Sequence, residues 1–180
     1  MSWQTPRTWT TGEPVTVWKL NRELRDNVLS LRNLNEHAVS LTLNGDDLDL
    51  PDGQNLVIPW TDAQWQIGTE IWSSGQGERL LAPVSGWYEL RVNAEFRADT
   101  GGEKAVGYKR NDSNLIYDLA QLDCISANSN NISGLDTVQL QNGQYIVVTC
   151  HQHSGAGLDD LVAGNVDQTR CTWRLLGTST

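Results

Sequence analysis

The sequence YELRVNAEFRAD, residues 88–99, alternates apolar and polar side chains at every position. The apolar members are Tyr88, Leu90, Val92, Ala94, Phe96 and Ala98. Successive side chains of an extended strand point to opposite faces of a sheet, so this pattern predicts a strand with one buried and one solvated face. Antiparallel sheets are the usual setting for such strands, and the fold is built outward from this one.

A second strong strand candidate, QYIVVTCHQH at residues 144–153, follows the turn sequence QNG at residues 141–143. It places Ile146, Val148 and Cys150 on one face. Weaker strand candidates are separated by clusters of Gly, Asn, Asp and Ser, and they cover residues 56–60, 69–73, 79–83, 104–110, 115–125, 137–140 and 169–176. Roughly eight to ten short strands of this kind predict a mainly β fold, an antiparallel jelly-roll β-sandwich over residues 43–180.

The N-terminal part of the chain has a different hydrophobic period. Spacings of three and four residues connect Val17, Leu20, Leu24, Asn27, Leu31, Leu34, Ala38 and Leu41. This spacing keeps one stripe of a helix facing partner helices, and it predicts a short coiled coil over residues 17–42 with Thr16 as its N-cap. Asn27 within the seam would fix the register, and Val28 beside the seam favours three chains. The alternative is a single helix that packs on its own domain.

Composition narrows the classes of partner. The net charge of −9 comes with no basic cluster, so binding to nucleic acid or anionic lipid is not expected. No stretch approaches the roughly 20 apolar residues needed to cross a bilayer, and the N-terminus has no apolar run typical of a signal peptide. The three cysteines are predicted to be buried thiols, with a bridge between Cys150 and Cys171 as the alternative.

The candidate metal ligands are two histidines and an acidic stretch. His151 and His153 share one face of a predicted strand, but without a third ligand they are interpreted as polar residues near the end of a strand. The acidic residues 46–53 lack the spacing of a calcium loop and are interpreted as a solvated turn. No nucleophile elbow, phosphate loop or zinc-protease motif is present, so no enzymatic activity and no cofactor are predicted. Carboxylates that meet only in space are the remaining alternative for catalysis.

Eight tryptophans accompany a single phenylalanine. Tryptophan combines a large apolar area with a hydrogen-bond donor, which suits interfaces as well as cores. Trp87 and Trp173 are therefore assigned to the core or to an interface. Trp3, Trp9 and Trp18 lie in or beside a leader too short to form a core, so they are expected to pack against sister chains or a larger assembly.

The opening sequence SWQTPRTWTTGEPVT, residues 2–16, continues into LN at 20–21 and LRDN at 24–27. This stretch resembles the leader of tailed-bacteriophage structural proteins. The resemblance implies a tail-fibre, minor tail or decoration protein, in which residues 1–16 attach to other virion proteins through Trp3, Pro6 and Trp9. It also implies a place on the surface of the virion, after assembly in the host cytoplasm.

The remainder resembles, more distantly, the trimeric jelly roll of complement globular heads and tumour-necrosis-factor-like ligands. The matching stretches are APVSGWYEL at 82–90, VQLQNGQYI at 138–146 and WRLLG at 173–177. The resemblance implies a homotrimer. The chain departs from the family in its scarcity of phenylalanine, which puts the packing of the core in question.

Together these features predict a non-enzymatic virion protein, a homotrimer whose head binds a glycan or protein receptor on the host surface. A decoration protein without a receptor site is one alternative, and a secreted lectin-like or signalling trimer is another. The expected receptor loops are polar segments at residues 73–78, 99–103, 111–114, 126–133 and 154–165, because loops on a rigid sandwich commonly carry recognition.

Overall fold

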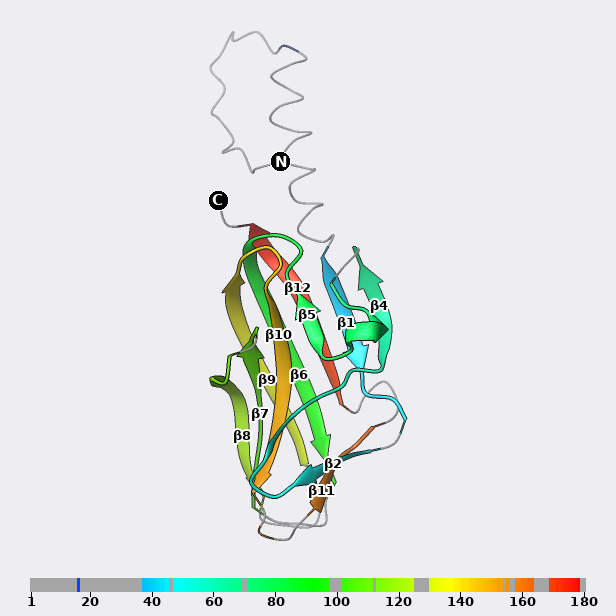
Figure 1. Ribbon diagram of the computed structural model, residues 1–180, viewed down its shortest axis with the longest axis vertical. Helices are drawn as coiled ribbons and strands as arrows, with labels where there is room; N and C mark the ends of the chain where they lie inside the picture. The colour runs from blue at the N-terminus through cyan, green and yellow to red at the C-terminus, as the bar shows by residue number, and fades with distance from the viewer. Residues whose placement is uncertain are drawn as a thin grey trace.

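A computed structural model describes residues 16, 37–45, 47–68, 71–97, 102–111, 113–124, 130–153, 155, 158–163 and 169–178. These residues form an antiparallel β-sandwich of jelly-roll type (Figure 1). Its strands are β1 (Ala38–Thr42), β2 (Leu48–Pro51), β3 (Asn55–Val57), β4 (Asp62–Ile67), β5 (Arg79–Leu81), β6 (Gly86–Phe96), β7 (Gly102–Arg110), β8 (Ile116–Cys124), β9 (Asn130–Leu140), β10 (Tyr145–His153), β11 (Leu158–Leu161) and β12 (Arg170–Thr178). The predicted mainly β sandwich is confirmed.

The strands form one sheet of seven and one of five. In the seven-stranded sheet the order is β2-β11-β6-β12-β1-β4, and β9 also pairs with β6. The five-stranded sheet has the order β3-β10-β7-β8, and β5 also pairs with β10. Within the described residues the only helical element is the 3-10 turn η2 (Ser74–Gln76). No helix in that part of the chain is long and apolar enough to cross a membrane.

The alternation predicted for residues 88–99 is seen in β6. Its five inward side chains, from Tyr88 to Phe96, are completely buried between the sheets, and the residues between them face outward. From the opposite sheet, Ile146, Val148 and Cys150 of β10 complete this part of the core. Burial of such side chains stabilises the fold by about 1.5–3 kcal/mol each, so these two strands account for much of the stability.

Trp173 of β12 connects the two sheets. Its ring stacks on Tyr88, with centroids 4.8 Å apart and planes 11° apart. Its indole N–H donates a 3.0 Å hydrogen bond to the carbonyl oxygen of Leu81, which belongs to β5 in the other sheet. Trp173 is fully buried, so the predicted core role is confirmed for this tryptophan, and large rings of Trp and Tyr occupy space where phenylalanine is scarce.

Residues 38–42 correct the predicted end of the coiled coil. Ala38 and Leu41, the last two seam positions, lie in the strand β1, which pairs with β12 on one side and β4 on the other. Leu41 is fully buried in the core, and β-branched Val39 and Thr42 favour the extended chain. The other seam positions, Val17, Leu20, Leu24, Asn27, Leu31 and Leu34, lie outside the described residues.

The short strands are the other difference from the prediction. Residues 71–73, within the predicted strand 69–73, are not extended in a sheet, and the edge strand is instead β4 at Asp62–Ile67. β2 and β11 were not predicted, although they pair with each other along four residues. Side chains of β4 are mostly exposed, so this strand carries no alternation of buried and solvated positions. Cys150 and Cys171 are free and buried, as predicted.

Candidate functional site

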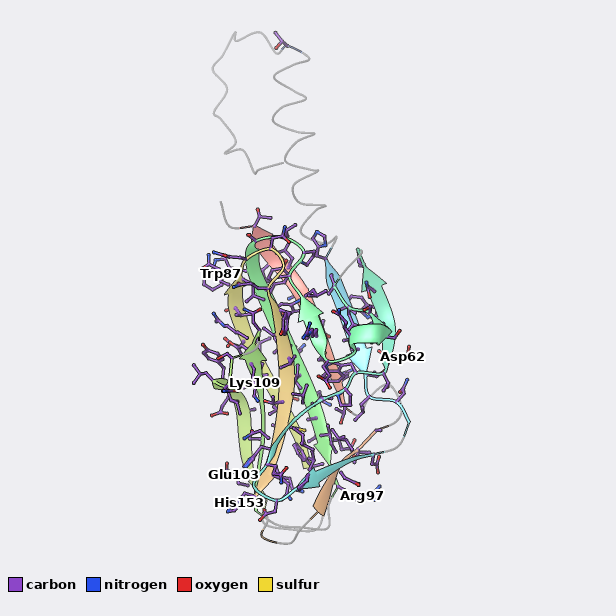
Figure 2. All side chains as sticks on the ribbon, in the orientation of Figure 1. Asp62, Trp87, Arg97, Glu103, Lys109 and His153 are labelled. Atoms are coloured by element: carbon purple, nitrogen blue, oxygen red, sulfur yellow. The ribbon has the colours of Figure 1, made fainter. Side chains whose placement is uncertain are left out.

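The outward side of the seven-stranded sheet, hereafter the outer face, carries an unusual set of side chains. In β6 the outward positions begin with Trp87, which is 47% exposed, and continue through Glu89 and Arg91. Figure 2 shows Trp87 near the end of the sandwich where β12 finishes. Trp87 is predicted to lie in the core or at an interface; its exposure excludes the core, and the interface stays a prediction.

Strand register identifies the residues that share this face. Trp65 of β4, Ser40, Thr172, Arg91 and Leu135 of β9 form one row across the sheet, because each is paired with the next. Residues that pair across adjacent strands point to the same side. Arg91 is exposed and points outward, so Trp65 and Leu135 do so as well.

Two further apolar residues join the outer face. Ile67 of β4 belongs to the row of Ala38, Arg174 and Glu89. Leu176 lies in the irregularity of β12 opposite Trp87, next to the inward-facing Leu175. Five of the six large apolar side chains that are exposed within the described residues are therefore on this face, and the sixth is Leu115.

The outer face also contains an ion pair and a hollow lined by polar side chains. Arg174 Nε lies 2.8 Å from Glu89 Oε1 in an ion pair between β12 and β6. A hollow of about 420 Å³ lies between Trp65 on one side and Arg91 and Asn93 on the other. Ser133 donates a 2.7 Å hydrogen bond to Asn93 Oδ1 at its border. Clustered aromatic and aliphatic side chains with arginines are typical of protein interfaces.

The two candidate metal ligands, His151 and His153, have different surroundings. His153 is exposed, and its Nδ1 lies 3.4 Å from Asp52 Oδ1. His151 is half-buried on the outward side of the five-stranded sheet, in the row of Ala105. Among the described residues, no three His, Cys, Asp or Glu side chains are grouped so that they could hold a metal ion.

The acidic stretch at residues 46–53 fastens loops at the end of the sandwich. Asp47 forms an ion pair with Arg97, and it accepts a 2.8 Å hydrogen bond from the backbone N–H of Ala163. Asp52 accepts a 3.1 Å bond from the N–H of Gly155. These carboxylates act as local hydrogen-bond acceptors, but the stretch is not a turn throughout, because Leu48–Pro51 forms β2 and Leu50 is fully buried.

The predicted attachment residues lie outside the described residues, and parts of the expected receptor loops belong to regular secondary structure. Trp3, Pro6 and Trp9 lie outside the described residues, so the attachment site stays a prediction. Of the expected receptor loops, 73–78 contains η2, while Gly102 and Glu103, residues 130–133 and residues 158–161 belong to strands. The described loop regions are therefore shorter than expected.

The sequence reasoning missed four residues of the outer face, which are Trp65, Ile67, Leu135 and Leu176. Their common signal is an apolar residue on the side of a strand that otherwise carries polar residues. Leu135 shows it most clearly, since it lies on the exposed side of β9 with Thr137 and Gln139. An apolar residue at such a position is typical of a strand with a covered second face.

Comparisons with known proteins identify the fold. Murine APRIL, in its crystal structure at pH 8.0, matches with a TM-score of 0.58 and 16% identity over 78% of this chain and 98% of that one. The globular domain of zebrafish complement 1qA gives 0.55 and 13% over 79% and 99%. Eiger TNF from S. frugiperda gives 0.57 and 12% over 80% and 94%.

Sequence comparison adds no relative to these structures. No protein-family model matches the chain, and no curated protein matches it. The virion role predicted from the leader has no support from these comparisons. At such low identity the likeness concerns the fold, and the chain has the jelly roll seen in tumour-necrosis-factor-like and complement globular domains.

Proposed function

We propose that this chain is a non-enzymatic recognition protein whose jelly-roll heads assemble into a homotrimer through the outer face. The observation that carries the proposal is the collection of Trp65, Ile67, Trp87, Leu135 and Leu176 on one side of one sheet. Burying the exposed half of each side chain would contribute about 1 kcal/mol apiece. The five-stranded sheet and the loops at the ends of the sandwich then remain available to a ligand.

The number of chains rests on two sequence features. The heptad spacing upstream of His37 suits three helices, and the head resembles a family of trimers. Three heads would present three copies of any ligand site, so weak single contacts would add up to firm attachment.

A secreted lectin-like or signalling trimer is the form of this function that the fold supports better. An attachment or decoration protein of a bacteriophage is the second form, and the leader at residues 2–16 favours it. Both forms share the trimeric recognition head, and they differ in what holds its N-terminus.

Light scattering on the full chain tests the assembly. We expect about three times the 20.0 kDa mass of one chain. Replacing Trp87→Arg or Leu135→Arg should place a charge in the interface and yield monomers that remain folded. Leu115→Arg is the matched control, because Leu115 is 59% exposed, as is Leu135, but lies in the loop before β8. A monomeric wild-type chain would exclude the proposed assembly.

Location distinguishes the two forms. Antibodies against the head, applied to purified phage particles in electron microscopy, should label the tails or capsids if the chain is a virion protein. For a secreted ligand, the antibodies should detect the protein free in the culture medium and leave the particles unlabelled.

A further inference from the structure

The outward side of the five-stranded sheet contains a hollow that the proposed assembly does not use. The outward positions of β7 are Glu103, Ala105, Gly107 and Lys109, and the middle two have little or no side chain. Larger side chains of β10 and β8 rise on both sides of them. The result is a hollow of about 220 Å³, here called the trench, with Glu103 at one end. Figure 2 shows Glu103 beside His153, at the end opposite Trp87.

Strand register places polar side chains along both sides of the trench. Gly107 pairs with Thr149 on β10 and with Asp118 on β8, and Ala105 pairs with His151. The ladder between β7 and β8 shifts between Val106 and Gly107, which brings Asp118 opposite Gly107. Asn55 of β3 pairs with His151 and completes the lining.

The floor of the trench contains the hydroxyl of Thr149. Thr149 is only 1% exposed, and its Oγ1 lies 3.4 Å from the point where a side chain on Gly107 would begin. In the described part of the chain, the Thr149 hydroxyl has no hydrogen-bond partner. Thr149 Oγ1 is not one of the buried side-chain atoms that lack a partner in the described residues, and Thr149 lines the open trench, where a hydroxyl of a ligand can replace water.

The other polar side chains of the trench come from four strands. Glu103, Asp118, Asn55 and His151 have no ion pair or side-chain hydrogen bond with any described residue. Two carboxylates therefore meet an amide, an imidazole and a hydroxyl in one small space. Lys109 is not among the residues that line it.

We propose that the trench binds a protonated amino sugar. The carboxylates of Asp118 and Glu103 would attract the ammonium group, as a charge-assisted hydrogen bond requires. Thr149, His151 and Asn55 would bond to the sugar hydroxyls, which act as both donors and acceptors. The volume suits one monosaccharide, and the net charge of −9 on the chain favours a cationic ligand.

The trench lies on the sheet that is not part of the proposed interface, so assembly leaves it open. The inference does not depend on the trimer, because one head holds a complete trench. Light scattering tests the assembly and sugar titration tests the trench, so failure of one leaves the other standing.

Titration calorimetry of the full chain with glucosamine, near neutral pH, tests the proposal. We expect saturable binding in about the millimolar range, as for a single small site. Glucose, which lacks the ammonium group, and ethylamine, which lacks the ring hydroxyls, should each bind at least about tenfold more weakly. Equal binding of glucose or ethylamine would contradict the assigned chemistry, and no saturable glucosamine binding would overturn the site.

Variants locate the binding. Asp118→Asn and Glu103→Gln remove one charge each with little change of shape, and each should weaken glucosamine binding by about tenfold. Thr149→Val removes the hydroxyl at nearly constant volume and should weaken it by about fivefold. Asp62→Asn, on the edge strand of the other sheet, is the control and should bind as the wild type does. If all four variants bind alike, the ligand lies elsewhere and the proposal is wrong.

Discussion

Single residues decide how the two sheets are held together, and Trp173 is the clearest case. Its indole N–H reaches the carbonyl of Leu81 across the core. Trp173→Phe should keep most of the stacking on Tyr88 but leave that carbonyl without a partner. We expect a loss of about 1–3 kcal/mol in the free energy of unfolding, measured by urea denaturation.

Trp72 offers a matched control for this prediction. Its indole also donates a 3.0 Å hydrogen bond to a carbonyl, that of Gly77, but Trp72 is only partly buried. Water can replace the lost bond there, so Trp72→Phe should cost less than Trp173→Phe. Equal losses would show that the buried hydrogen bond is not what distinguishes Trp173.

The buried thiols make a prediction about alkaline pH. Burial raises the pKa of Cys150 from 9.0 to about 12, and it raises the pKa of Cys171 well above 9.0. The unfolded thiols release their protons first, so the stabilisation is complete below pH 9.0 and is lost as pH rises toward about 12. The free energy of unfolding should therefore fall with rising pH in this window.

Urea denaturation under reducing conditions from about pH 8 to about pH 11 measures this dependence. Each thiol contributes a slope of at most about 1.4 kcal/mol per pH unit. Cys150→Ala should reduce the slope even though it lowers stability at every pH. An unchanged slope would mean that Cys150 ionises equally in both states. Burial also raises the pKa of Tyr88 to about 12, and this residue adds to the fall above pH 10.0.

Among the elements, β1 joins the edge strand β4 to the rest of its sheet. It lies between β12 and β4, and Val39 and Leu41 are fully buried. A chain that begins at Leu43 should lose the strand that joins β4 to β12 and show no cooperative thermal transition by circular dichroism. A chain that begins at His37 keeps every described strand and should unfold cooperatively. If both unfold alike, β1 is not required for the fold.

The contact between β9 and β8 depends on a glycine. A side chain on Gly134 would begin 2.6 Å from Leu119 Cβ, and the backbone of Leu119 is close behind it. Gly134→Ala should therefore lower the free energy of unfolding by about 1–3 kcal/mol. A side chain on Gly177 in β12 would meet no atom within 4 Å, so Gly177→Ala should change stability by less than about 0.5 kcal/mol. Chemical denaturation of both variants checks the difference.

Sequence reasoning identified the elements whose two faces differ. β6 and β12 show alternation because one face is buried and the other is not. β10 is buried on both faces over residues 146–150, and its apolar run after the turn QNG is what predicts it. β4 could not be predicted, because its side chains are exposed apart from Ala63. The sequence predicts helix over β1 because Ala38 and Leu41 fit both a three-residue spacing and a buried strand. Hydrophobic periodicity alone does not distinguish a helix from a buried strand in a short segment.

The candidate surfaces were predicted less well, since they depend on register. Trp65 and Leu135 are seventy residues apart and share a row only because β1, β12 and β6 lie between them. The trench depends equally on the shift that pairs Gly107 with Asp118. The sequence singles out His151 as a candidate site residue. The polar residues beside it in the trench come from β3, β7 and β8, and their proximity cannot be read from the sequence.

For the whole molecule, assembly should couple to stability. If the outer face is an interface, the thermal midpoint of the wild-type chain should rise with protein concentration, because association stabilises the folded state by mass action. Calorimetry over a hundredfold range of concentration measures this. Trp87→Arg should make the midpoint independent of concentration. A midpoint of the wild type that does not move would argue against an interface coupled to folding.

The pairing of β1 with β12 has a mechanical consequence. The two strands are antiparallel neighbours, so the start of β1 and the end of β12 lie at the same end of the sandwich (Figure 1). Force applied between these two ends would open the ladder one hydrogen bond at a time. Force applied between the start of β1 and a ligand in the trench runs along the strands instead, and it must shear many bonds together. The head should resist tension far better through its ligand than through its own two ends.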